Sequence, residues 1–106
     1  MAVIVTTAFE VGGREITESL GTVFGVVVRS QGIGGNILAG LRSLGGGEIH
    51  EYTRLLEDTR RQAVDRMLEN AAKLGADAVV AMRFDSSEIG NTMTEVVAYG
   101  SAVKLK

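Results

Sequence analysis

The residues best suited to metal chemistry lie together at Glu48, His50 and Glu51. Imidazole nitrogens and carboxylate oxygens are common ligands of Zn²⁺ and related cations. The helical zinc motif needs a second histidine four residues after the first, but Arg54 stands there, and a guanidinium cannot ligate zinc. One chain therefore supplies two or three ligands at most. Glu48, His50 and Glu51 are candidates that symmetry-related copies would have to complete.

A glycine-rich segment at residues 32–35 follows an expected strand and opens an expected helix, as phosphate-binding turns do. A dinucleotide fingerprint would need a third glycine where Ile37 stands. A P-loop would need Lys-Ser or Lys-Thr after Gly40, where the chain has Leu41 and Arg42. We interpret the segment as a strand-to-helix connection and expect no cofactor.

The sequence also lacks a convincing catalytic nucleophile or general acid–base pair. Ser43 lacks the first glycine of a nucleophile elbow and falls in an expected helix rather than after a strand. Asp85 and Glu88 are close in sequence, but they flank an expected hairpin loop, where polar residues are typical. We therefore expect no catalytic residues and no enzymatic activity.

Composition limits the function further. The 106 residues contain no Cys, one His, 11 basic and 13 acidic side chains, for a net charge of −2. Zinc sites that use Cys, thiolate nucleophiles and redox pairs are thereby excluded. A broad surface for nucleic acid is not expected at this charge. No apolar run approaches the roughly 20 residues of a membrane span, so we expect a cytoplasmic protein with one domain over residues 1–106.

The elements that must position these residues follow from periodicity and glycines. Residues 1–7 read as a strand, and residues 15–28 as a long strand bent at Gly21 or Gly25. A short helix is expected at residues 36–44. The apolar run 78–82 leads into a hairpin with Gly90 and Asn91 in its turn. Together with a long helix, these elements predict a small α+β domain.

Residues 48–74 have the pattern of an amphipathic helix. Four apolar residues on one face are expected in the core: Leu56, Ala63, Met67 and Leu74. Charged residues follow the opposite face at steps of four: Glu57, Arg61, Asp65, Glu69 and Lys73. Gly75 is well placed to close the helix.

The order of these motifs along the chain resembles the YbjQ-like family, small and mostly bacterial proteins of unassigned function that are often labelled heavy-metal-binding. The resemblance rests on residues 13–25, the Leu-rich segment before Gly45, Tyr52, residues 74–80 and residues 100–103. It implies a YbjQ/dodecin-like α+β subunit, a ring-shaped homopentamer and no established enzyme activity.

The residues themselves also predict a homo-oligomer. Residues 23–28 and 78–82 present apolar side chains on both faces of the sheet, whereas one long helix covers one face. The apolar stripe of residues 36–44 needs a partner as well. A neighbouring subunit would cover both surfaces.

The sequence therefore leaves three classes of function open. The leading hypothesis is a non-enzymatic oligomeric module that binds a small ligand or a protein partner. The alternative is a metal-binding protein with oxygen and His donors at subunit interfaces. An enzyme of unknown class is the third.

Overall fold

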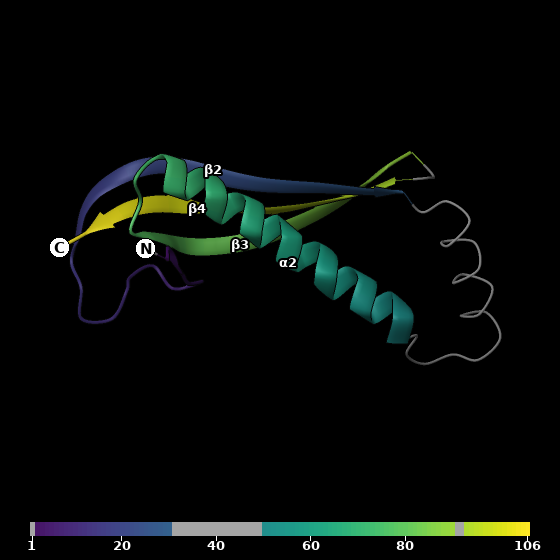
Figure 1. Cartoon of the computed structure of the whole chain (residues 1–106), viewed down its shortest axis with the longest axis horizontal. Helices are drawn as coiled ribbons and strands as arrows, with labels where there is room; N and C mark the ends of the chain where they lie inside the picture. Colours follow the sequence, from purple (N-terminus) through teal and green to yellow (C-terminus); the bar gives the residue numbers. More distant parts are fainter. Residues whose placement is uncertain (1, 31–49, 91–92) are drawn as a thin grey trace.

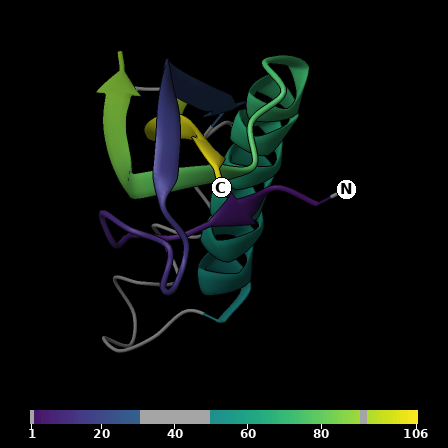
Figure 2. The ribbon, with the colours of Figure 1, turned by 90° about the vertical axis from the view of Figure 1, so that its left-hand side faces the viewer.

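The computed structural model of the chain describes residues 2–30, 50–90 and 93–106. Within them, a four-stranded sheet carries one long helix on one face (Figures 1 and 2). The elements are β1 (Ile4–Val5), β2 (Ile16–Ser30), α2 (His50–Lys73), β3 (Ala78–Ile89) and β4 (Met93–Leu105). The expected α+β class is confirmed. The short helix expected at residues 36–44 lies outside the described residues.

The strand order in the sheet is β1-β3-β4-β2. β1 pairs with β3 in parallel, and the other two pairings are antiparallel. The hairpin expected near the end of the chain is confirmed, because β3 and β4 pair along their length and Gly90 has a φ of +63°. β2 pairs on one side only and therefore forms an edge of the sheet.

Two glycines of β2 have different structural roles. At Gly21 the register with β4 shifts and φ is +104°, which confirms the bend expected there. Gly25 instead lies against the helix, where a Cβ atom would overlap the backbone oxygen of Ala63 and the backbone nitrogen of Met67. The missing side chain allows strand and helix to touch.

Two alanines and one methionine form the centre of the contact between α2 and the sheet. Ala63, Met67 and Ala71 are completely buried, as predicted for the first two. The prediction was wrong for Leu56 and Leu74, which are 38% and 50% exposed. Both leucines share the helix face of Ala63. Leu56 lies near the start of α2, where the helix diverges from the strands, and Leu74 lies beyond the last helical residue (Figure 1).

The end of α2 is closed by a Schellman motif. The Gly75 nitrogen donates to the Ala72 oxygen at 3.0 Å, and the Ala76 nitrogen donates to the Ala71 oxygen at 3.1 Å. Gly75 has a φ of +76°, the left-handed conformation that this cap requires. The predicted helix end is confirmed, and the chain turns directly from it into β3.

A bulge interrupts β3 between Val80 and Arg83, where the register with β4 shifts. Ala81 has a φ of +54°, in the left-handed region that only glycine adopts without strain. Its nitrogen donates to the Ala8 oxygen at 2.8 Å, so the N-terminal segment holds the bulge in place. The extra residue changes which side chains of β3 face the helix: Phe84 does, and Arg83 does not.

Within residues 2–30, 50–90 and 93–106, the face of the sheet opposite α2 is covered at one end only. Ala78, Val80 and Val103 are buried there beneath Val11 and Ile16. The expectation that the strand at residues 78–82 needs a neighbouring subunit was therefore wrong, because the chain covers both of its faces.

At the other end of this face, β2 exposes a row of three apolar side chains. Phe24, Val26 and Val28 are 52%, 39% and 48% exposed. We call these three residues the β2 patch. The Tyr99 ring on β4 lies beside Phe24, with 6.5 Å between ring centroids.

Candidate functional site

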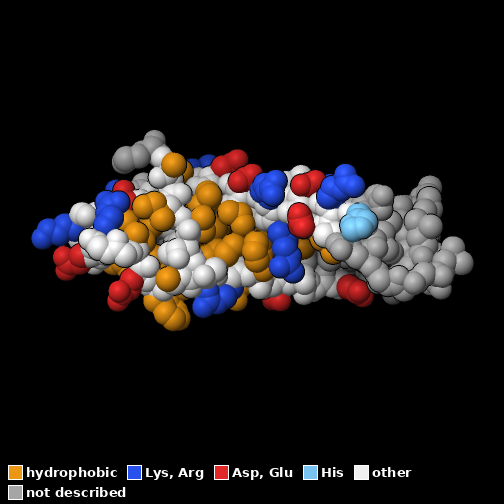
Figure 3. Space-filling view, turned by 90° about the horizontal axis from the view of Figure 1, so that it is seen from below, with side chains coloured by type: hydrophobic (Ala, Val, Ile, Leu, Met, Phe, Trp, Pro, Cys, Tyr) orange, Lys and Arg blue, Asp and Glu red, His pale blue; other side chains and the backbone are white. Residues whose placement is uncertain are grey.

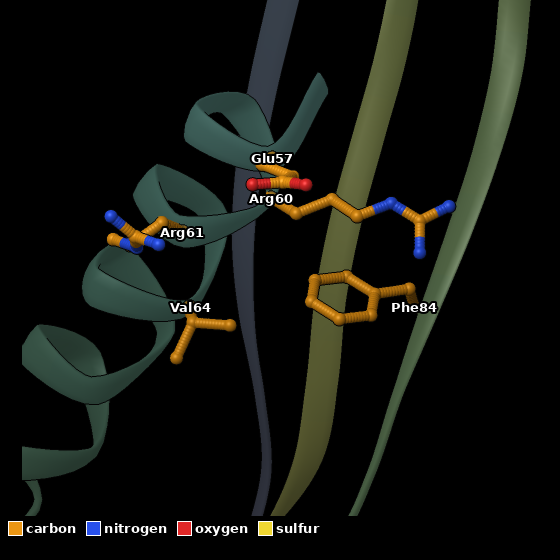
Figure 4. Close-up of a pocket in the computed structure, with 5 residues that line it drawn as sticks. All are labelled: Glu57, Arg60, Arg61, Val64 and Phe84. Carbon is orange, nitrogen blue, oxygen red and sulfur yellow. The ribbon is translucent and has the colours of Figure 1, made fainter. Parts of the chain in front are cut away.

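A groove of about 440 Å³ lies between α2 and β3 (Figure 4). The groove is shallow and open to solvent along most of its length, so a ligand bound there would stay partly exposed. Four side chains of the helix and one of the strand line it: Glu57, Arg60, Arg61, Val64 and Phe84. We call it the α2–β3 groove.

Helical spacing and the β3 bulge bring these side chains together. Glu57, Arg60, Arg61 and Val64 are three or four residues apart and so lie on adjoining turns of one side of α2. Phe84 reaches the same space because the bulge turns it toward the helix, where it packs at the margin of the core. The groove therefore has one helical wall and one wall from the sheet.

The groove has an apolar floor with one cation over it, because Arg60 extends over Phe84 whereas Arg61 points away from that ring (Figure 4). Val64 and Phe84 are half-buried, whereas Arg60, Arg61 and Glu57 are exposed. The Arg60 guanidinium lies over the Phe84 ring with 5.0 Å between its Cζ and the ring centroid, a cation–π contact. Two guanidinium groups and one carboxylate leave a local charge of +1.

Hydrogen bonds to β2 hold the helical wall in position. Arg66 donates to the Val26 oxygen at 2.6 Å, and Asn70 donates to the Phe24 oxygen at 2.8 Å. The Arg29 side chain donates from β2 to the buried Thr59 hydroxyl, 3.2 Å away. Long polar side chains thus tie the free edge of the sheet to α2.

The metal candidates are not brought together in the described part of the chain. His50 is the first residue of α2 and is exposed on the surface, drawn pale blue in Figure 3. Glu48 and the side chain of Glu51 lie outside what the structure describes. Over residues 2–30, 50–90 and 93–106 no three His, Asp or Glu side chains gather as a metal site would require.

The two carboxylates near the hairpin were placed incorrectly. Asp85 and Glu88 do not flank the loop, because β3 continues to Ile89. They are three residues apart in a strand, so their side chains leave opposite faces of the sheet. Asp85 accepts a hydrogen bond from the Ser86 nitrogen at 2.9 Å. The pair cannot act jointly on one substrate.

Ser43 and the glycine-rich segment 32–35 lie outside the described residues. A second cavity, of about 70 Å³, is lined by Ala2, Ile4, Arg14, Ala76 and Asp77. Asp77 accepts a hydrogen bond there from the Leu105 nitrogen at 2.9 Å, which fixes the end of β4. This cavity has room for water molecules but not for a sizeable ligand.

Sequence reasoning missed the α2–β3 groove. Glu57 and Arg61 were identified only as exposed helical residues, and Arg60, Val64 and Phe84 were not singled out. The adjacent arginines at 60 and 61 were the available signal. Phe84 carried none, because strict alternation from the buried Val79 would turn it away from the helix.

Comparison with known proteins identifies the family. The sequence model of the YbjQ family, described as "Putative heavy-metal-binding", matches residues 3–106. The chain belongs to this family. The resemblance noted from the sequence is thereby confirmed over nearly the whole chain.

Relatives in bacteria and archaea support the assignment. The UPF0145 protein of Bradyrhizobium sp. (strain ORS 278) is 57% identical over 105 residues, covering 99% of this chain and 95% of the relative. The UPF0145 protein of Methanoregula boonei is 56% identical over 101 residues, covering 95% and 83%. That of Thermoplasma volcanium is 54% identical with the same coverage.

One solved structure shares the fold. It is a protein of unknown function from Pediococcus pentosaceus, of the DUF74 family, with a TM-score of 0.64 and 98% of each chain covered. The sequence identity is 15%, so the likeness concerns the fold alone. Among the described residues, no helix is both long enough and apolar enough to cross a membrane.

Proposed function

We propose that this YbjQ-family protein is a non-enzymatic homo-oligomeric module that binds a small ligand or a protein partner. The observation that carries the proposal is the β2 patch. Its three side chains lie on an edge strand, on the half of the sheet face that the described part of the chain leaves exposed. Adjoining apolar side chains on a sheet edge favour burial against another subunit.

The shape of the chain supports the same proposal. Its Cα radius of gyration is 16.9 Å, whereas a compact domain of this length has a value of about 13 Å. Hydrophobic side chains also gather in the middle of the surface seen in Figure 3, between charged ones. An extended subunit with exposed apolar surface gains stability from assembly. The resemblance to YbjQ-like proteins favours a pentameric ring.

Native mass spectrometry of protein purified from its own cells tests this proposal, because it measures subunit number and retained ligand together. We expect a pentamer for the wild type and dissociation for Val26→Lys. Val5→Lys is the matched control, since Val5 is also 39% exposed but lies on β1. A monomeric wild type contradicts the proposal, as does a Val26→Lys variant that assembles like the Val5→Lys control.

A metal-binding function is the second candidate, and the description of the family favours it. In a ring, copies of one donor approach one another, so His50 with Glu48 or Glu51 could form a site between subunits. Calorimetric titration of Zn²⁺, Cu²⁺ and Ni²⁺ into wild type and His50→Ala tests it. Loss of binding in the variant supports the site, and equal binding by both proteins removes it.

A further inference from the structure

We propose that the α2–β3 groove binds a small organic anion with a flat apolar body, such as an aromatic carboxylate. This inference rests on the proposed function as a ligand-binding module and names the class of ligand. Three features of the groove carry it: its apolar floor, its net positive charge and the placement of the Arg60 guanidinium over the Phe84 ring.

The floor selects a flat apolar body. The Phe84 ring is half-buried at the margin of the core, with Val64 facing it from the helix (Figure 4). Because the Arg60 guanidinium covers one face of the Phe84 ring, a ligand ring would contact Phe84 edge-on, and Val64 supplies aliphatic contact from the helical wall. The open volume of about 440 Å³ has room for one or two fused rings that remain partly exposed to solvent.

The charges select an anion. Arg60 and Arg61 stand on the same wall, and neither guanidinium is engaged by a carboxylate within the part of the chain that the structure describes. Glu57 offsets one of the two charges and disfavours ligands that carry several negative charges. A monoanion therefore fits the local charge of +1.

Arg60 is placed to recognise a carboxylate. A guanidinium that lies over a ring uses its face for that contact, and its N–H donors point outward in its own plane. Those donors match the two oxygens of a carboxylate. Because the Phe84 ring already holds the side chain, less side-chain freedom is lost when a ligand binds.

The probe for this proposal is 2-naphthoate, titrated by isothermal calorimetry into the full-length protein at low salt. 2-Naphthalenemethanol has the same rings without the charge. We expect naphthoate to bind and the alcohol to bind about tenfold more weakly, because a charge-assisted bidentate pair is lost.

Variants locate the site. Arg60→Gln should weaken naphthoate binding by about tenfold or more. The affinity of Arg60→Lys should lie between those of wild type and Arg60→Gln, since lysine keeps the charge but lacks the planar guanidinium. Lys73→Gln removes the same charge 13 residues along α2, about 20 Å away, and should change affinity less than twofold. Equal affinity of Arg60→Gln and wild type, or no naphthoate binding by wild type, overturns the proposal.

Light scattering on the same samples separates this proposal from the proposed function. A monomer that binds naphthoate through Arg60 supports the groove and contradicts the oligomer. An intact oligomer that does not bind naphthoate contradicts the groove alone. A change of mass in Arg60→Gln would make the groove a subunit interface and would also overturn the ligand proposal.

Discussion

At the scale of single residues, backbone conformation and close approach explain positions that hydrophobicity does not. Gly25 stands in a Val-rich strand because the helix backbone occupies the space of its Cβ atom. Ala81 adopts a left-handed conformation that is costly for any residue with a side chain, and hydrogen bonds from its own and the next nitrogen to the N-terminal segment hold it there. At both positions, a small change of side chain should have a measurable effect on the free energy of unfolding.

Gly25→Ala should lower the free energy of unfolding by about 2–3 kcal/mol, because the added methyl group must displace the helix backbone at Ala63 and Met67. Gly12→Ala is the control, since a Cβ there meets nothing within 4 Å. Its stability should be unchanged or raised by up to about 1 kcal/mol. Urea unfolding at one protomer concentration measures both, and equal stability of the two variants would show that helix and strand do not touch here.

Ala81 predicts two effects of opposite sign. Ala81→Gly should raise stability by about 0.5–1 kcal/mol, because relief of the left-handed strain exceeds the entropic cost of glycine. Ala81→Val should lower it, since a β-branched side chain is worse at a φ of +54°. Thermal unfolding would show the two melting temperatures on either side of wild type; a less stable glycine variant would argue against the bulge.

At the scale of elements, periodicity predicted the long helix and the strands β2 and β4 with boundaries within a few residues. It placed the end of β3 too early, because the loop was expected to begin at Ser86 and β3 continues to Ile89. It also predicted the buried positions Ala63 and Met67 correctly. Periodicity failed to predict burial where the helix extends beyond the sheet, as at Leu56. The pattern of apolar residues in a helix does not show how far the opposing sheet extends. It failed again at β3, because one extra residue at Ala81 reverses the alternation beyond it and brings Phe84 into the groove.

Met67→Asp tests the assigned face of α2. Met67 is completely buried against the sheet, and an unpaired carboxylate there should cost about 4 kcal/mol or more, enough to unfold many small domains. Arg54→Asp introduces the same side chain at an exposed position of the helix and should change stability by less than about 0.5 kcal/mol. Circular dichroism during heating distinguishes them. A Met67→Asp protein that melts like wild type would place a different face in the core.

At the scale of the whole molecule, the exposed β2 patch is the main reason to expect assembly with other subunits. The chain covers one face of its sheet with α2 and half of the other with its N-terminal segment. The remaining half exposes Phe24, Val26 and Val28. The sequence predicted that residues 23–28 need cover from a partner, but it did not show which of their side chains stay exposed, because that depends on how α2 covers the sheet. The number of subunits did not follow from the residues either, because it depends on contacts between chains.

Size-exclusion chromatography coupled to light scattering, at micromolar concentration, tests this central claim most directly. We expect a wild-type mass near 56 kDa, five times the 11.2 kDa of one chain. Such a mass would show a pentamer, and its loss in Val26→Lys but not in Val5→Lys would place the β2 patch between subunits. A stable species of 11.2 kDa would contradict the account, because the apolar row on β2 would then remain exposed to water.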